Sequence, residues 1–120
     1  MIAPPKIAVY AMAKNEVAHV DQFIETTKGA DLVIVTDTGS TDGTPEKLQA
    51  AGIQVRHAAV LPWRFDLGTN VALCNVPPTI DLCVKLDLDE VIVSTNDRPW
   101  REELEQLWIA GNRQIDYAYN

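Results

Sequence analysis

The chain has few cysteines, few histidines and no long apolar run. Cys74 and Cys83 are too isolated for a disulfide framework or a metal-ligand pair, and we expect both to be small, reduced core residues. No apolar stretch approaches the roughly 20 residues that a membrane-spanning helix needs. The first residues also lack the apolar segment of a signal peptide. These absences favour a cytoplasmic protein without a transmembrane segment.

Basic residues are also scarce. Lysine and arginine number 10 against 17 aspartates and glutamates, which gives a formal net charge of -7. Nonspecific binding to nucleic acid depends on lysine and arginine, so we expect no nucleic-acid partner. The same negative field opposes an anionic substrate, unless a metal ion supplies positive charge locally.

The chain contains enough residues for one folded domain. Its 120 residues, of which 47% are hydrophobic and 22% charged, suit a single domain over residues 1–120. Short apolar or β-branched runs alternate with segments of helical periodicity. The runs predict strands at 6–13, 31–37, 53–58, 80–87 and, at the end, 114–120. The periodic segments predict helices at 15–29, 44–51, 65–76 and 97–111.

Several polar residues stand where helix caps are expected. Asn15, Thr44 and Asp97 are predicted N-caps, and Gly29 is a predicted C-cap. In the last helix, one face carries a set of large apolar residues that we expect to be buried, namely Trp100, Leu104, Leu107 and Trp108.

This alternation predicts an α/β fold with three layers, a mainly parallel, Rossmann-like sheet between two layers of helices. In such sheets, ligands bind beyond the carboxyl ends of the strands. Asp37 ends the second predicted strand, and Asp87 and Asp89 end the fourth. We therefore expect all three carboxylates at the ligand-binding edge.

The stretch "KLDLDEVI" places two carboxylates, Asp87 and Asp89, one residue apart. Mg²⁺ and Mn²⁺ prefer oxygen ligands, and Mg²⁺ is often held by one or two carboxylates together with substrate phosphates. A divalent cation here neutralises the acidic cluster and receives a diphosphate. The simpler alternative is an acidic turn that faces solvent.

Four segments together resemble the nucleotide-sugar-binding half of family-2 glycosyltransferases of the GT-A fold. They are "AMAKNE", "VIVTDTGSTDGT", "PWRFDLGTNVAL" and "KLDLDEVI", which follow one another in the family's order and cover most of the chain. The resemblance implies transfer from a UDP-sugar donor to an unknown acceptor, with Mn²⁺ or Mg²⁺ as cofactor and inversion at the anomeric carbon.

The resemblance also assigns roles to individual residues. Asp37 matches the aspartate that accepts a hydrogen bond from the uracil ring, and Ala11 to Ala13 match the backbone that lines the base. Glu16, which closes the first motif, also falls in the nucleotide-sugar-binding set.

In the Asp-x-Asp motif, Asp87 matches the aspartate near the ribose and the metal, and Asp89 matches the more direct metal ligand. Leu88, between them, is included in the nucleotide-sugar-binding set. Glu90 fits the motif either as a site residue or as a structural hydrogen-bond acceptor.

Two departures from the family pattern qualify these expectations. Thr69 stands where the family usually has an arginine that holds the donor; Arg64 or Lys85 could replace it, although Lys85 is better placed to pair with a carboxylate. The chain is also shorter than the family's domain, and no residue matches the general base. A truncated, minimal enzyme is one reading, with a homo-oligomer or partner completing the site. A nucleotide-sugar-binding module without catalysis is the alternative.

Overall fold

The computed structural model describes residues 3–59, 71–94 and 98–111. Four strands in this part of the chain form one sheet in the order β3-β2-β1-β4, and every pairing is parallel. The strands are β1 (Ile7–Ala13), β2 (Leu32–Asp37), β3 (Gln54–His57) and β4 (Leu82–Lys85). The predicted parallel α/β sheet is therefore confirmed.

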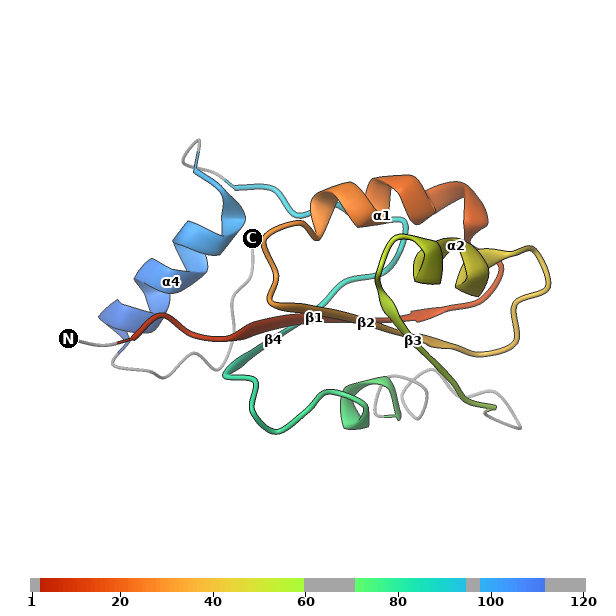
Figure 1. Ribbon diagram of the computed structural model, residues 1–120. Helices are drawn as coiled ribbons and strands as arrows, with labels where there is room; N and C mark the ends of the chain where they lie inside the picture. Colours follow the sequence, from red (N-terminus) through yellow and green to blue (C-terminus); the bar gives the residue numbers. More distant parts are fainter. Residues whose placement is uncertain (1–2, 60–70, 95–97, 112–120) are drawn as a thin grey trace.

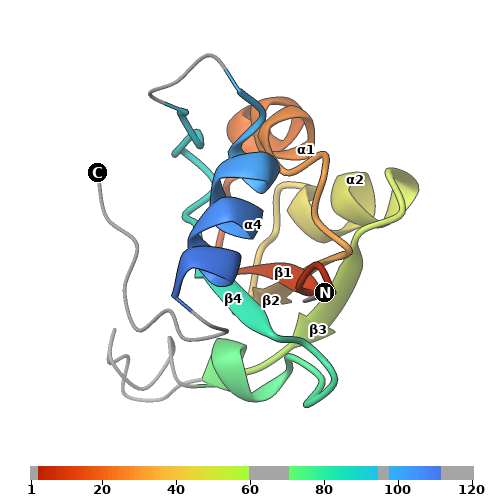
Figure 2. The same cartoon turned by 90° about the vertical axis from the view of Figure 1, so that its left-hand side faces the viewer.

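Helices lie on both faces of this sheet. A 3-10 turn, η1 (Val17–His19), leads into α1 (Val20–Thr26), and α2 (Thr44–Ala50) follows β2. Figures 1 and 2 show α1 and α2 together on one face and the short helical segment at residues 71–74 on the opposite face. The result is the predicted three-layer arrangement.

The core lies mainly between the sheet and the α1–α2 layer. Phe23 of α1 and Leu48 of α2 are fully buried against the sheet. Burying an apolar side chain of this size contributes roughly 1.5–3 kcal/mol. The cluster's buried residues are Val9, Ala11, Ala13, Val20, Phe23, Val35, Leu48, Ile53, Val55, Leu86 and Leu88. This packing holds the carboxyl ends of β1 and β2 in a fixed relation.

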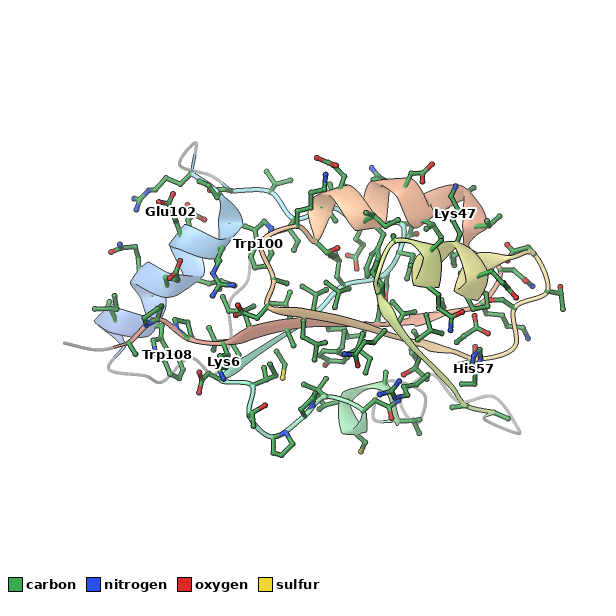
Figure 3. The ribbon with its side chains drawn as sticks, viewed as in Figure 1. Lys6, Lys47, His57, Trp100, Glu102 and Trp108 are labelled. Carbon is green, nitrogen blue, oxygen red and sulfur yellow. The ribbon has the colours of Figure 1, made fainter. Side chains whose placement is uncertain are left out.

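The last described helix, α4 (Trp100–Ala110), lies near the amino-terminal ends of the strands. Its Trp108 packs with Ile7 and Leu82, and Figure 3 shows this tryptophan close to the start of β1. The indole Nε1 of Trp100 donates to the carbonyl of Thr26 at 3.0 Å. The helix is thus fastened to the end of the sheet opposite the acidic residues.

Arg101 provides the polar part of this attachment. Its guanidinium donates to the carbonyl oxygens of Gly29 and Pro5, at 2.6 and 3.1 Å, and to the Asp31 carboxylate at 3.0 Å. Partial burial by itself raises the pKa of Asp31, but the N–H of Ile7 and the Arg101 guanidinium outweigh it and hold that pKa below its ordinary value. One side chain therefore joins α4 to two separate segments of backbone.

The predicted caps are largely wrong. Asn15 does not cap α1, because its backbone is left-handed (φ 55°) and its side chain bonds to a different loop. Thr44 is the first residue of α2, and Gly43 stands at the N-cap position. Helix α1 ends at Thr26, before Gly29. The N-cap position of α4 belongs to Pro99, and the predicted cap Asp97 lies outside the described residues, as does the strand expected at 114–120.

Two burial predictions are also wrong. Cys74 and Cys83 are free thiols, as expected, but both residues are exposed. The short helical segment turns Ala72 toward the sheet and leaves Cys74 on its outer side, whereas Cys83 lies on β4, beyond the cover of that segment. Leu107 is 50% exposed, so the buried face of α4 is narrower than predicted.

No helix within the described ranges has the length and apolar character needed to cross a bilayer.

Candidate functional site

The candidate site lies at the carboxyl edge of the sheet, the edge formed by the C-terminal ends of the strands. The chain adds β2 and β3 on one side of β1 and then returns to add β4 on the other side. The direction of strand addition therefore reverses at β1, and in open α/β sheets ligands bind at such a reversal. Asp37 ends the strand on one side of β1, and the Asp-x-Asp motif follows the strand on the other.

Beyond the end of β4, buried and more exposed residues continue to alternate through the acidic motif. Val84 is half-buried, and Leu86 and Leu88 are 6% and 1% exposed, all within the main core cluster. Lys85 and Asp87, which lie between them, are outside that cluster, as is the exposed Asp89 that follows. The apolar residues therefore anchor the segment in the core while the carboxylates remain outside it.

A tight turn fixes the motif after Leu86. The N–H of Asp87 donates to the Glu90 carboxylate at 2.9 Å, and the N–H of Glu90 donates to the carbonyl of Asp87 at 3.0 Å. Leu88 sits inside this turn with its side chain in the core, so only its backbone is available to a ligand. Glu90 thus has the structural acceptor role that was one of its two predicted readings.

The ammonium group of Lys85 lies 3.4 Å from the Asp87 carboxylate, which confirms the predicted pairing with a carboxylate. Their side chains are 33% and 44% exposed, so this is a solvent-screened pair of small energetic value. The pair leaves Asp87 accessible to a cation.

The carboxylates suit a hard divalent cation in part. Within the described ranges, no group of three or more aspartate, glutamate, histidine or cysteine side chains is arranged to hold a metal ion. Asp87 and Asp89 supply oxygen donors that solvent can reach, and Mg²⁺ characteristically takes one or two carboxylates and completes its shell with phosphates and water. The residues present fit a cation that arrives with a diphosphate better than a preformed metal cage.

Asp37 has a different environment from the Asp-x-Asp pair. It is 3% exposed, and its Oδ2 accepts the N–H groups of Gly39 and Ser40 at 3.0 and 2.9 Å. Its Oδ1 accepts the Ser40 hydroxyl at 2.5 Å. The positive φ of Gly39 (122°), which an L side chain rarely adopts, lets the loop curl around the carboxylate. Asp37 therefore organises its own loop, whatever else it binds.

The loop after β2 is bonded to the loop after β1 by side-chain oxygens. Three consecutive N–H groups, those of Asn15, Glu16 and Val17, donate to the side chains of Ser40, Thr44 and Asp42 at 2.8, 3.0 and 3.1 Å. In return, the side-chain carbonyl of Asn15 accepts the N–H of Thr41 at 2.8 Å. The two loops therefore form one structural unit at the carboxyl edge.

Asp42 and Thr44 also hold each other in place. The Thr44 hydroxyl, together with the N–H groups of Val17 and Thr44, stabilises the Asp42 carboxylate and keeps its pKa below the ordinary value. Ser40, Asp42 and Thr44 were not predicted as site residues, because the motif "VIVTDTGSTDGT" was used to assign a role to Asp37 alone and Thr44 was predicted as an N-cap. The sequence signal that could have indicated these residues is the high density of side-chain oxygens in this loop, because serine, threonine and aspartate side chains often accept backbone N–H groups.

The structure brings most of the predicted site residues to one edge. Ala11 and Ala13 lie on β1, and Ala13 pairs in register with Asp37 of β2. Lys85 pairs with Tyr10 of β1 and directly precedes the acidic turn, so the turn extends β4 toward the same edge. The predicted residue Arg64 lies outside the described residues.

Two of these residues are less open than the sequence suggested. Ala11 and Ala13 are 1% and 3% exposed, and the carbonyl of Ala13 accepts both the N–H and the hydroxyl of Thr38. Glu16 has a partly exposed carboxylate 3.8 Å from His19, while its N–H is held by Thr44. The first loop therefore offers a ligand mainly the side chains of its residues.

Known proteins that are similar to this chain in sequence are glycosyltransferases. No protein-family model matches the chain. An uncharacterised glycosyltransferase of Rickettsia bellii is 29% identical over 115 residues, which are 95% of this chain and 36% of the relative. A lipopolysaccharide core biosynthesis glycosyltransferase of Rhizobium meliloti is 28% identical over 123 residues, 98% of this chain and 42% of the relative. The chain thus spans about two-fifths of the length of these two proteins.

Solved structures agree with the sequence relatives. Glucosyl-3-phosphoglycerate synthase of Mycobacterium tuberculosis, in complex with Mn²⁺, UDP and phosphoglyceric acid, matches with a TM-score of 0.61 and 26% identity, over 72% of this chain and 34% of that one. The fold is of the GT-A type. A mannosyltransferase of Pyrobaculum calidifontis, in complex with GDP-mannose and Mn²⁺, shares this fold with a TM-score of 0.59 and 21% identity, over 78% and 31%.

Proposed function

We propose that this chain is the nucleotide-sugar-binding part of a metal-dependent glycosyltransferase of the family-2 type, with a UDP-sugar as donor. The observation that carries the proposal is the placement of Asp37 and the Asp87–Glu90 turn on either side of β1 at the reversal of strand order. Neighbouring strands lie about 4.8 Å apart, so two strand spacings separate the two acidic positions by roughly 10 Å. That separation suits a base at one position and a diphosphate at the other.

The proposed role of Asp37 is to accept a hydrogen bond from the uracil ring, next to the β1 backbone at Ala11 to Ala13. Support comes from its place at the end of β2, in register with Ala13. The similar solved structures are complexes with UDP or GDP-mannose. The bases of these nucleotides, uracil and guanine, each have a ring N–H that can donate to a carboxylate. Glu16, on the adjoining loop, belongs to the proposed nucleotide-sugar-binding set, as does Arg64.

Asp87 and Asp89 would hold Mn²⁺ or Mg²⁺, and the cation would stabilise the charge of the departing UDP as a Lewis acid. Asp87 has the more fixed backbone, since the turn with Glu90 holds its N–H and its carbonyl. Asp89 is more exposed and is the proposed direct ligand. Lys85 adds a positive charge beside Asp87, which favours an anionic diphosphate at the same place.

Calorimetric titration of the chain with UDP and UDP-sugars, with and without Mn²⁺, tests this proposal. We expect UDP binding that Mn²⁺ strengthens, and Asp89→Asn to remove the metal dependence. Asp37→Ala should weaken UDP binding and leave the affinity for Mn²⁺ nearly unchanged. Asp21→Asn is the matched control, because that aspartate is 80% exposed on α1 and its carboxylate pairs with Lys47. Absence of metal-dependent UDP binding at millimolar concentration would overturn the proposal.

The alternative function is a nucleotide-sugar-binding module without catalysis. Such a module would bind the donor without a general base, a group that typically contributes 10²–10⁴-fold to the rate. Release of free sugar from a UDP-sugar with Mn²⁺, or transfer to an acceptor, separates the two functions. For an active enzyme, NMR assignment of the product anomer tests the proposed inversion. Turnover by this chain would exclude the module.

A further inference from the structure

The Asp37 carboxylate has most of its hydrogen-bonding capacity already in use. An ionised carboxylate offers about four acceptor positions and no donor. Two positions on Oδ2 are taken by the N–H groups of Gly39 and Ser40, and one on Oδ1 is taken by the Ser40 hydroxyl. One acceptor position on Oδ1 therefore remains for a ligand.

Ser40 determines which position this is. The N–H of Asn15 donates to the Ser40 oxygen at 2.8 Å, and the hydroxyl proton of Ser40 in turn points to Oδ1 of Asp37 at 2.5 Å. A hydroxyl carries one proton, so its direction is fixed once a neighbour donates to its oxygen. This relay connects the loop after β1 with the carboxylate that ends β2, and it immobilises the carboxylate in one orientation.

A carboxylate fixed in this way is selective for ligands that donate. Asp37 is 3% exposed, so water does not easily replace a missing partner there. A buried acceptor that faces another acceptor is costly, whereas one that meets an N–H gains a charge-assisted hydrogen bond. On the hydrogen-bonding edge of the base, uracil and guanine have a ring N–H, whereas the corresponding ring nitrogen of cytosine and adenine has a lone pair.

We infer that Ser40 is a positioning residue for base recognition, which holds Asp37 with one acceptor position open and so selects nucleotides whose base carries a ring N–H. The inference rests on the proposed function, because it requires the base to reach Asp37. Ser40 acts through Asp37 and need not touch the nucleotide.

The test is a calorimetric comparison of UDP with N3-methyl-UDP, both with Mn²⁺, on the full chain and on Ser40→Ala. The methyl group replaces the hydrogen of the ring N–H with a bulkier apolar group and leaves the ribose and the diphosphate unchanged, so metal and diphosphate contributions cancel in the ratio of the two affinities. We expect the wild type to prefer UDP by roughly tenfold or more, the worth of one hydrogen bond to a charged group. Ser40→Ala should reduce this preference by roughly threefold or more, because the released carboxylate can turn away from the methyl group.

Two further variants separate positioning from folding. Ser40→Thr keeps the hydroxyl and should restore most of the preference. Thr41→Ala changes the adjacent residue, whose backbone N–H still reaches Asn15 and whose hydroxyl does not contact Asp37, and should leave the preference unchanged. If Ser40→Ala does not fold, the wild-type comparison still tests the open acceptor position, and Ser40→Cys, whose thiol is a weaker donor than a hydroxyl, should reduce the preference in the same direction.

The outcomes distinguish this inference from the proposed function. Wild-type protein that binds neither ligand overturns the proposed function and the inference with it. Metal-dependent binding of UDP and N3-methyl-UDP with equal affinity overturns the inference alone. An equal loss of affinity for both ligands in Ser40→Ala, with the ratio unchanged, gives Ser40 a purely structural role and also overturns it.

Discussion

Leu88, the buried residue between the two aspartates, should contribute to stability and to metal-dependent binding at once. Its side chain is 1% exposed in the main core cluster, although it lies in the centre of an acidic turn. Truncation of such a leucine to alanine typically costs about 2–5 kcal/mol, through lost transfer energy and the cavity left behind. A chain of this size has a total stability of about 6–18 kcal/mol, so the Leu88→Ala variant should still fold.

Urea unfolding, followed by tryptophan fluorescence, measures this cost. Trp100 packs against the same cluster and Trp108 is buried near the start of β1, so the signal should follow the loss of core packing. We expect the midpoint to fall while the slope with urea stays unchanged, as for a loss of stability without a change in the folded surface. Leu107→Ala is the matched control, because that leucine is 50% exposed on α4 and should lose less than about 1 kcal/mol.

Titration of the same variants with UDP and Mn²⁺ gives the second part of the result. Leu88→Ala should weaken metal-dependent binding because the turn loses its anchor, and Asp89→Asn should weaken it without moving the urea midpoint. If Leu88→Ala loses no more stability than Leu107→Ala, the assignment of Leu88 to the core is wrong. If it loses stability but binds UDP with full metal dependence, the core does not position the turn.

Three further predictions concern the rest of the fold. Arg101→Ala should lower the free energy of unfolding by about 1–3 kcal/mol, since two backbone carbonyls lose their donor, and Arg101→Lys should restore only part of it in urea titrations. The pKa of Asp31 is lowered, so its stabilisation is present above the ordinary pKa and is lost as the pH falls through the lower, folded-state value; Asp31→Asn should flatten the stability profile in this acid range, and an unchanged profile would refute the role of Asp31. Cys83 is exposed, but neighbouring groups still desolvate its thiol in part and raise the pKa of that thiol, so iodoacetamide should modify it more slowly at pH 8 than a free cysteine, and an equal rate in mass spectrometry would contradict this.

The strands and the acidic edge could be predicted from the sequence because both follow from local patterns. The β-branched run that ends at Asp37 and the apolar run before Asp87 specify strands, and parallel strands place their carboxyl ends together. The fold and the positions of both acidic groups therefore needed only the order of the elements.

The hydrogen-bond partners could not be predicted in this way. Asn15 has the side chain of a helix cap, but the loop after β2 lies nearby in space and supplies a competing partner, the N–H of Thr41. Ser40 shows its role only when Asp37 and Asn15 are seen on either side of it. Asn15 is more than twenty residues from Ser40 and Thr41 in the chain, and only the folded sheet brings it to them.

The prediction that the cysteines are buried failed for a related reason. A small sulfur-containing residue in an apolar run is usually buried. Cys83, however, lies on β4 at the edge of the sheet and is exposed. The short helical segment before β4 packs instead on Tyr10 and Ile34. Which part of a sheet face a short helix covers depends on the path of the connection and not on the residues of the strand.

The alternation from Val84 to Asp89 means that the number of residues in this segment matters as much as their identity. Deleting one residue between Leu82 and Asp87 would shift the later strand residues and the start of the turn to the opposite face, which would bring the Asp87 carboxylate toward the core and Leu86 toward solvent. Point substitutions there alter one position, whereas a single-codon deletion displaces the anchor of the whole turn. We therefore expect engineered libraries of this segment to yield active variants through substitution and none through changes in length.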